Sequence, residues 1–414
     1  MDWPRKRLRF LLNKAMPVAG RDLMGVSESV TFLPMEAIGE QGELDLTRTI
    51  GFDEASSGLT LFFDGDVVVA KITPCFENGK GALIENTATG LGLGTTELYV
   101  LRPSASLDGK YLYYVTVDPA FRVLGETQMT GAAGQKRVPE NFVRDYLISC
   151  PPISEQVRIT RFLDDELEIV DTLIEAKQKL LGLLAEKRRT LVAEAVMRGL
   201  DRSAPLRPSG IDWLGDIPEH WEIERSRWLF NERDERSETG EEEMLTVSHI
   251  TGVTPRSQKD VNMFEAETTA GYKLCFTGDL VINTLWAWMG AMGTAPVDGI
   301  ASPAYNVYTP GQRLLPAYVD ALVRIPVFAQ EVTRYSKGVW SSRLRLYPEG
   351  FFETFWPVPP LDEQKQIVAR IAEERVKIDK LATVTEHSIG LLKERRSALI
   401  AAAVTGQIAI PEAA

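Results

Sequence analysis

The chain has 414 residues, 44% of them hydrophobic, which is enough for about two to four domains with real cores. Its formal net charge of -12 argues against a uniformly basic protein that coats DNA, so DNA binding would need local basic surfaces or basic partner subunits. No stretch is apolar for long enough to cross a membrane, and the opening MDWPRKRLRF lacks the core of a signal peptide. Three widely spaced cysteines suggest neither a disulfide framework nor a zinc site, so we expect a cytoplasmic protein.

The first predicted domain covers residues 1–150 and mixes strands with helices. It opens with WPRKRLRFLL and continues with LTLFFDGDVVVAKI, whose two β-rich runs flank Asp64-Gly65 and predict a β-hairpin. GLGLG follows, and it is succeeded by TTELYVLRP, which predicts a strand and not the start of a helix. Because a nucleotide-binding glycine loop needs a helix N-terminus behind it, GLGLG is not expected to bind a cofactor.

A long helix is predicted over residues 151–200, which begin with PPISEQ. The two prolines suit the approach to a first helical turn, and the interior has no proline and is rich in good helix formers. Ser154 is the expected N-cap, because its oxygen can accept a free backbone N–H group. A seven-residue apolar register, which requires a partner helix, runs along the segment. Its members are Leu163, Val170, Leu184 and Leu191.

The second half of the chain repeats the first half in the same order. A linker with Pro and Gly, residues 201–220, leads to a second predicted domain over 221–357, a second helix over 358–406 and a tail over 407–414. WEIERSRWLF repeats the opening at an offset of 218 residues, YKLCFTGDLVINTL repeats the hairpin at 213, and PPLDEQ begins the second helix at 208. A period of this length indicates a duplicated domain and not the short units of a solenoid.

The two long helices are predicted to pack together as an antiparallel coiled coil with pseudo-twofold symmetry. Both far exceed the usual length of helices in globular proteins, which favours this pairing over two amphipathic helices that each lie on their own domain. The second helix has Asp362 as its expected N-cap. Its register residues are Ile371, Ile378, Leu392 and Leu399. The predicted fold class is therefore α+β, with two α/β globules in tandem that are each followed by a long helix.

Catalytic and metal-binding motifs are not matched by this sequence. CPPI and VPPL superficially resemble the Pro-Pro loop of amino-methyltransferases, which needs a polar residue before the prolines and an aromatic residue after them. Cys150 and Val358 precede the prolines here, and Ile153 and Leu361 follow them. The three histidines are isolated and make no metal-ligand set. We therefore expect no catalytic residue, no metal and no cofactor in this chain.

These motifs together resemble the specificity (S) subunit of type I restriction–modification systems. The resemblance rests on two variable globules that alternate with PP-[IL]-x-EQ helices, and on WLGDIPEHW before the second globule, and it covers nearly the whole chain. In that family each globule is a target recognition domain that reads half of a bipartite, asymmetric DNA site. The paired helices set the spacing of the half-sites and form the docking surface for two methyltransferase (M) subunits.

The resemblance therefore implies a non-catalytic subunit with three kinds of partner. These are double-stranded DNA, two methyltransferase subunits and two restriction (R) subunits. S-adenosylmethionine, ATP and Mg are expected on the partner subunits and not on this chain, and no membrane is involved.

Two polar segments in each predicted domain are candidates for DNA contact, with solvated loops as the alternative. Lys and Arg can neutralise phosphates or read guanine edges, and Asn can contact bases. Trp286 and Trp288 are interpreted as core or as aromatic support. The first domain offers Lys71, Asn78, Lys80, Gln135, Lys136 and Arg137. The second domain offers Asn283, Thr284, Lys337, Trp340, Ser341, Arg343 and Arg345.

Charged residues at matched positions of the two helices are candidates for partner docking, with solvent-facing charge as the alternative. They are Glu186, Lys187, Arg188, Glu394, Arg395 and Arg396. The Trp3-Pro-Arg-Lys-Arg segment, and Trp221 with Arg225 and Arg227, suit either phosphate contacts or packing on a strand surface. Two other functions remain open for the chain. One is a coiled-coil adaptor between proteins without DNA readout, and the other is a methyltransferase that binds S-adenosylmethionine by itself.

Overall fold

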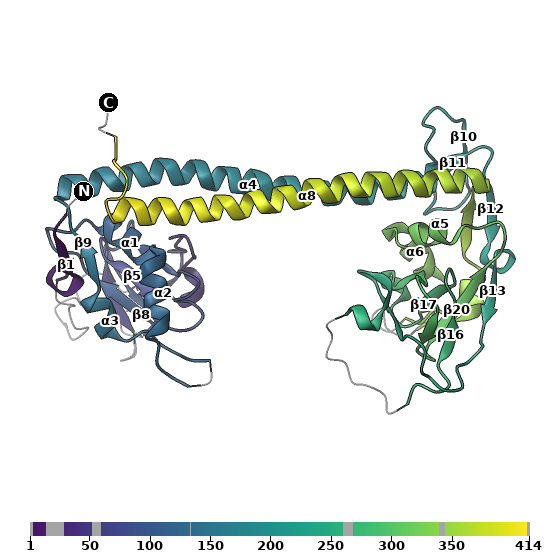
Figure 1. Ribbon diagram of the computed structural model, residues 1–414, viewed down its shortest axis with the longest axis horizontal. Coiled ribbons are helices and arrows are strands. Elements are labelled where there is room, and N and C mark those ends of the chain that lie inside the picture. Colours follow the sequence, from purple (N-terminus) through teal and green to yellow (C-terminus); the bar gives the residue numbers. More distant parts are fainter. Residues whose placement is uncertain are drawn as a thin grey trace. The chain divides into compact units, whose positions relative to one another are not determined.

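The computed structural model describes residues 3–13, 29–51, 59–132, 134–259, 268–338 and 344–411. Tertiary contacts divide the chain into two compact units. Unit 1 comprises Met1–Gln178 with Glu386–Ala414, and unit 2 comprises Lys179–Thr385. Each unit contains one α/β domain and a part of each long helix, α4 (Ile153–Arg198) and α8 (Leu361–Val404) (Figure 1). Within the described ranges, no helix is both long enough and apolar enough to span a lipid bilayer.

The domain of unit 1 is built from two small sheets and a strand pair. One sheet has the order β3-β2-β7-β4, with β2 and β7 parallel, and the other is antiparallel with the order β6-β5-β8. Helices α1 and α2 lie beside the second sheet (Figure 1). The elements are β1 (Arg5–Arg7), η1 (Leu8–Phe10), β2 (Ser29–Leu33), η3 (Met35–Ala37), β3 (Thr49–Gly51), β4 (Thr60–Phe63), β5 (Val67–Ala70), β6 (Gly81–Leu83), β7 (Leu91–Gly94), β8 (Leu98–Leu101), α1 (Gly109–Val117), α2 (Pro119–Thr127), α3 (Glu140–Asp145) and β9 (Leu147–Ser149).

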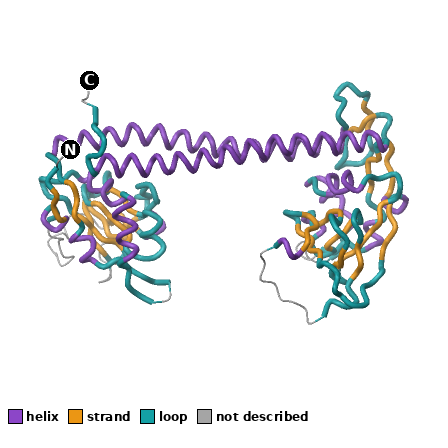
Figure 2. Tube along the Cα trace, in the orientation of Figure 1, coloured by secondary structure: helices purple, strands orange, loops and turns teal. Residues whose placement is uncertain are grey.

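The domain of unit 2 has one four-stranded sheet, β13-β20-β17-β18, and several strand pairs, whose strands are orange in Figure 2. The predicted linker is folded, because Trp213, Leu214 and Ile217 pack into the core and carry the β10–β11 pair with them. The elements are β10 (Leu206–Pro208), β11 (Asp216–Pro218), β12 (Glu222–Arg225), η5 (Ser226–Trp228), β13 (Phe230–Arg233), β14 (Leu245–Ser248), β15 (Gly252–Pro255), η6 (Arg256–Gln258), β16 (Lys273–Cys275), β17 (Leu280–Asn283), η7 (Ala287–Met289), β18 (Met292–Thr294), β19 (Gly299–Ala301), β20 (Tyr305–Pro310), α5 (Pro316–Val323), α6 (Pro326–Tyr335), α7 (Pro348–Phe351) and β21 (Phe355–Val358).

The predicted hairpin around Asp64-Gly65 is wrong. The two β-rich runs form β4 and β5, which belong to different sheets, and the tight turn between them places Gly65 at a φ of 90°. Strand β5 is central in its sheet, with β6 on one edge and β8 on the other, so no edge is free for β4. The corresponding strands of unit 2 are arranged in the same way, because β17 lies between β18 and β20 and has no free edge for β16.

The two long helices pack against each other within each unit. In unit 1, Ile159 and Leu163 near the start of α4 share a core with Ile400 and Ala403 near the end of α8. In unit 2 the end of α4 shares a core with the start of α8, through Val196 and Ile367 among others. The beginning of one helix thus meets the end of the other in both units, which confirms the predicted antiparallel packing.

The predicted N-caps of the long helices are wrong. Helix α4 begins at Ile153 and α8 at Leu361, so Ser154 and Asp362 lie inside the first turn. The carbonyl oxygens of Pro152 and Pro360 accept the first amide hydrogen bonds instead. Both prolines therefore precede the helix, where the absence of an N–H group on proline removes no helical hydrogen bond.

A buried glutamine in the first turn fixes each long helix to its own domain. Gln364 is fully buried, and its Oε1 accepts a hydrogen bond from the amide of Leu315, the N-cap of α5, at 2.8 Å. Gln156 is equally buried and accepts from the amide of Asp108, the N-cap of α1, also at 2.8 Å. The Nε2 of each glutamine donates to two backbone carbonyl groups. The glutamine of the repeated Glu-Gln motif thus has a structural role.

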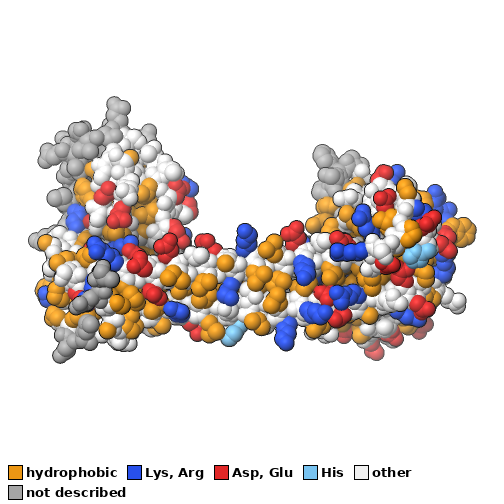
Figure 3. Space-filling model, turned by 90° about the horizontal axis from the view of Figure 1, so that it is seen from above, with side chains coloured by type: hydrophobic (Ala, Val, Ile, Leu, Met, Phe, Trp, Pro, Cys, Tyr) orange, Lys and Arg blue, Asp and Glu red, His pale blue; other side chains and the backbone are white. Residues whose placement is uncertain are grey.

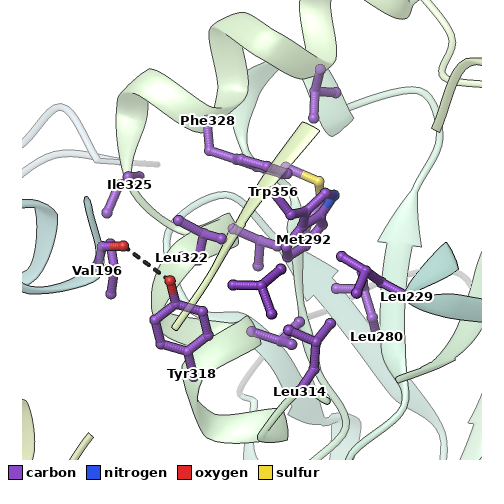
Figure 4. Packing of buried hydrophobic residues seen from close by; sticks show 14 of the residues in the cluster. Val196, Leu229, Leu280, Met292, Leu314, Tyr318, Leu322, Ile325, Phe328 and Trp356 are labelled. Atoms are coloured by element: carbon purple, nitrogen blue, oxygen red, sulfur yellow. Dashed lines mark hydrogen bonds between the residues drawn. The ribbon is translucent and has the colours of Figure 1, made fainter. Parts of the chain in front are cut away.

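A buried tyrosine fixes each domain to the end of the other long helix. The hydroxyl of Tyr318 lies 3.0 Å from the carbonyl oxygen of Val196 near the end of α4, as Figure 4 shows among the packed apolar side chains. In unit 1, the hydroxyl of Tyr111 lies 2.9 Å from the carbonyl oxygen of Val404 at the end of α8. Burial raises the pKa of both phenols above the ordinary range, so each tyrosine remains a hydrogen-bond donor. Each domain is therefore fixed to both long helices by equivalent contacts.

Candidate nucleic-acid interface

An equivalent narrow loop precedes the last short helix of each domain. In unit 1, Thr130 and Arg137 exchange backbone hydrogen bonds of 3.0 and 2.8 Å across the loop. In unit 2, Lys337 and Arg345 exchange two backbone hydrogen bonds of 2.9 Å across the equivalent loop. These are the glycine-containing segments in which the sequence predicts DNA contact. Both therefore occupy the same place in their domains, between α2 and α3 and between α6 and α7.

The structure brings the two candidate segments of unit 1 together. Ile72 forms a bridge with Arg137, and the carbonyl oxygens of Lys71 and Lys136 accept hydrogen bonds from the opposite segment at 2.9 Å. Gln135 and Lys136 are exposed on the loop. The Lys71 ammonium lies 5.2 Å from the ring centre of Tyr99, which leaves it half-buried over an aromatic face. Residues that are far apart in sequence thus form one basic surface.

The other two candidate cations of unit 1, Arg137 and Lys80, are engaged with protein groups. Arg137 donates two hydrogen bonds to Glu97, at 2.8 and 2.7 Å, and this pairing raises the pKa of Arg137 and lowers that of Glu97. Lys80 Nζ donates to the carbonyl oxygen of Met35 at 3.1 Å, while Asn78 is exposed. Because Glu97 neutralises Arg137 locally, Lys136 carries the exposed positive charge of the loop.

Asn283 and Thr284 support the loop of unit 2 and are not available to DNA. Their relative exposures are 8% and 4%. Asn283 Nδ2 donates to the Tyr305 hydroxyl at 3.3 Å, and Thr284 Oγ1 donates to the carbonyl oxygen of Ala304 at 2.9 Å and accepts from Arg345 Nε at 3.2 Å. The expectation of base contact by these two side chains is therefore corrected, because burial and internal hydrogen bonds occupy them.

The remaining candidates of unit 2 are only partly described. Lys337 is exposed at the base of the loop, and Arg345 is half-buried with its guanidinium 5.8 Å from the ring centre of Tyr347. Trp340, Ser341 and Arg343 lie outside the described residues.

Two stacked tryptophans lie next to this loop, beyond the end of β17. The rings of Trp286 and Trp288 are 6.4 Å apart with an interplanar angle of 18°, and Trp286 is 51% exposed. Leu285 and Met289 are also exposed, so the turn presents an apolar surface. The interpretation of Trp286 as core is wrong. In the corresponding turn of unit 1 the aromatic residue is Phe76, which is fully buried, so the two turns differ in which side chains they expose. Exposed aromatic faces stack on bases or enter between base steps.

The charged residues predicted for partner docking divide into two groups. Arg188 pairs with Asp379 at 3.1 Å in unit 2, and Arg395 and Arg396 pair with Glu166 and Asp171 at 3.4 and 3.2 Å in unit 1, so these arginines join α4 to α8. The other three residues, Glu186, Lys187 and Glu394, are exposed on the helices, as Arg395 is too. Figure 3 shows that charges of both signs are mixed along the helices, which gives no single-sign docking surface on that face.

The buried carboxylates of the repeated Gly-Asp motif are structural. Asp66 accepts two hydrogen bonds from Arg102, at 2.8 and 2.7 Å. Asp279 accepts from Arg233 at 2.8 Å and from Thr309, which stands where Arg102 stands in the first repeat. Each arginine also lies over a phenylalanine ring. Neither acid is therefore free for catalysis. In the part of the chain that the structure describes, no three His, Cys, Asp or Glu residues are grouped so that they could hold a metal.

Comparison with known proteins places the chain beside restriction specificity subunits. No protein-family model matches it. A segment of 166 residues is 40% identical to the specificity subunit of the type I restriction enzyme EcoEI from Escherichia coli, covering 38% of this chain and 28% of that protein. A segment of 206 residues is 35% identical to the EcoAI specificity subunit from the same species, covering 49% of this chain and 33% of that protein. The matched segments thus span about a third of these relatives or less.

Solved structures show a similar fold over nearly the whole chain. A chain from a study of complex assembly and conformational transition in the type I R-M system aligns with a TM-score of 0.76 at 18% identity, over 98% of both chains. The HsdS subunit from Thermoanaerobacter tengcongensis aligns with a TM-score of 0.60 at 18% identity, over 98% of this chain and 97% of that chain. The predicted fold class is thereby confirmed.

Proposed function

Because the chain is a relative of type I restriction specificity subunits, as its repeated helices predict, we propose that it is the non-catalytic subunit that gives such a complex its DNA sequence specificity. Each domain would read one half of a bipartite, asymmetric site, and the paired helices would set the spacing of the half-sites. Two methyltransferase subunits and two restriction subunits would assemble with it in the cytoplasm. S-adenosylmethionine, ATP and Mg would be bound by those partners.

The observation that carries this proposal is the contrast between a repeated frame and unlike loops. Gln156 and Gln364 make the same hydrogen bonds at the start of their helices. The loops that precede α3 and α7 start and end at equivalent backbone bridges. Their surroundings differ, since Arg137 is paired with an acid and Arg345 lies by a threonine and a tyrosine. Two domains held alike with unlike loops suit two different half-sites.

The chemistry of modification is assigned to the partners. Adenine methylation of duplex DNA requires the target base to be flipped into an enclosed pocket with its methyl donor. The buried carboxylates Asp66 and Asp279 are already neutralised by arginines, and the repeated glutamines are fully hydrogen-bonded. This chain would therefore supply recognition and spacing, while the partners supply the reaction.

Co-expression with its methyltransferase subunit in a host without adenine methylation tests the proposal. Methylome sequencing should then show one bipartite motif, and exchange of residues 1–150 for the domain of another specificity subunit should change one half of that motif only. Deletion of one heptad from each long helix should shorten the spacer by about three base pairs, because seven helical residues rise about 10.5 Å. Unmodified DNA would refute the proposal. A stable complex whose methylation pattern ignores this chain would favour an adaptor.

A further inference from the structure

The α/β domain of each unit carries an exposed aromatic side chain at an equivalent position in its first short helix. Phe10, at the end of η1, is 74% exposed, and Trp228, at the end of η5, is 73% exposed. The two positions are related by the offset of the repeated opening, WPRKRLRF and WEIERSRW. A single exposed ring is ordinary on a protein surface, but a large ring at both copies of one position favours a surface that is buried in a complex, because each ring forgoes the free energy of burial.

The surroundings of the two rings are also equivalent. In unit 1, Arg7 and Arg9 both pair with Asp145, the first at 3.4 Å. In unit 2, Arg225 and Arg227 both pair with Glu353, the first at 2.5 Å. Each acid stands at the same place before the strand that precedes Pro-Pro. Two guanidinium groups share one carboxylate in each unit, so a surplus positive charge remains beside the ring.

An apolar residue on the neighbouring strand completes each group. Leu147 faces Arg7 across the β1–β9 pair and is 40% exposed. Phe355 faces Arg225 across the β12–β21 pair, with its ring centre 5.1 Å from the guanidinium. We name each group an aromatic–arginine patch. The patch of unit 1 comprises Arg7, Arg9, Phe10, Asp145 and Leu147, and that of unit 2 comprises Arg225, Arg227, Trp228, Glu353 and Phe355.

We propose that the two aromatic–arginine patches bind two copies of one partner protein, one copy on each unit. The matching surface would be an apolar pocket for the ring with an acidic rim for the surplus positive charge. This inference rests on the proposed function, in which the partner present in two copies is the methyltransferase subunit. It places a docking surface on each domain, away from the helix charges that the sequence suggests.

The exposed rings favour a protein partner over the DNA backbone, because a phosphate backbone offers no apolar pocket in which Phe10 or Trp228 could be buried. The likeness of the patches argues against a role in reading two different half-sites, since the candidate DNA surfaces differ between the units, as the stacked tryptophans occur in unit 2 only among the described residues. A surface that meets the same partner twice is expected to stay the same in both copies.

The test uses the full chain with the methyltransferase subunit of the same system. Phe10→Ala, Trp228→Ala and the double variant are titrated with that subunit, and bound copies are counted by native mass spectrometry. Each single variant should bind one copy normally and the second about 30-fold more weakly or worse, because central aromatic anchors contribute at least that factor. The double variant should bind both copies weakly. Trp228→Phe should retain most of the affinity.

Controls separate this inference from the proposed function. Ile250→Ala removes a side chain that is 72% exposed in unit 2 outside the patch, and it should leave both copies bound. Thermal unfolding of all variants should match the parent, since the rings are exposed. Normal partner binding by the double variant would overturn the inference alone. Weaker DNA binding with unchanged partner binding would also overturn it, in favour of a phosphate contact. A parent chain that binds no methyltransferase subunit would overturn the proposed function as well.

Discussion

Replacement of Gln364 by methionine should destabilise unit 2 far more than unit 1. The side chain is fully buried, and its Oε1 accepts from the amide of Leu315, while its Nε2 donates to the carbonyl oxygens of Arg313 and Pro359, each at 2.8 Å. Methionine has nearly the same length but cannot replace these hydrogen bonds. The variant therefore leaves three backbone groups without their partner, at the point where α8 joins the start of α5.

The expected loss follows from the number of hydrogen bonds. Three polar groups left unsatisfied cost about 1–3 kcal/mol each, or about 3–9 kcal/mol together. Part of this is recovered because methionine needs no partner of its own, so the total is about 2–6 kcal/mol. This is a large part of the roughly 5–15 kcal/mol that stabilises a folded domain. For a unit of this size, the loss corresponds to a decrease in Tm of roughly 4–24 °C.

Differential scanning calorimetry gives the Tm values, and hydrogen exchange locates the loss, which should appear first in α5 (Pro316–Val323). Gln366→Met is the matched control, because Gln366 is exposed two residues further along the same helix. Gln156→Met should have the same effect on α1, since Gln156 makes the equivalent hydrogen bonds in unit 1. If Gln364→Met lowers the Tm no more than Gln366→Met does, the buried amide does not hold the junction and the reasoning fails.

Lys136→Ala should weaken DNA binding and reduce the slope of log affinity against log salt by about one, whereas Arg137→Ala should change the slope less, because Glu97 already neutralises it. Fluorescence anisotropy at several salt concentrations measures both slopes, and equal slopes for Lys136→Ala and the parent would exclude the loop from the interface. Trp286→Ala should weaken binding to the half-site of unit 2 by about 5- to 150-fold, without lowering the Tm, if its exposed ring stacks on DNA. Glu331→Gln should stabilise unit 2 near neutral pH and lose this advantage in acid. Burial raises the pKa of Glu331, so the folded chain holds the proton more tightly and loses stability as the pH rises above the ordinary carboxyl pKa; thermal unfolding as a function of pH checks this.

The long helices could be predicted because their signals are local and repeated. A proline pair, a run of helix formers and a seven-residue apolar register all fall within one segment, and α4 and α8 lie inside the predicted ranges 151–200 and 358–406. Their antiparallel packing was predictable for the same reason, since two copies of one apolar register can satisfy each other.

The sequence did not show the environments that depend on distant parts of the chain. The runs around Asp64-Gly65 are strands, but their partners are set by which sheet edges remain open. Arg137 belongs to a polar loop in the sequence, yet its guanidinium is held by Glu97, forty positions earlier. Thr284 follows a strand and has a polar side chain, and only the tertiary structure shows that Ala304 and Arg345 occupy its hydroxyl.

The buried Gly-Asp motif shows how the domains could diverge while their attachment to the helices stayed the same. A buried carboxylate must keep a cation, because an unpaired buried charge is strongly destabilising. Asp66 has Arg102 from the end of β8, whereas Asp279 has Arg233 from β13, and Thr309 fills the place that Arg102 leaves. The positive charge is retained although the strand that supplies it has changed. The repeated part of each domain thus requires certain interactions and not a particular sequence. Loops that take no part in those interactions can change without loss of the fold. That freedom suits the proposed role, in which the two domains read different half-sites.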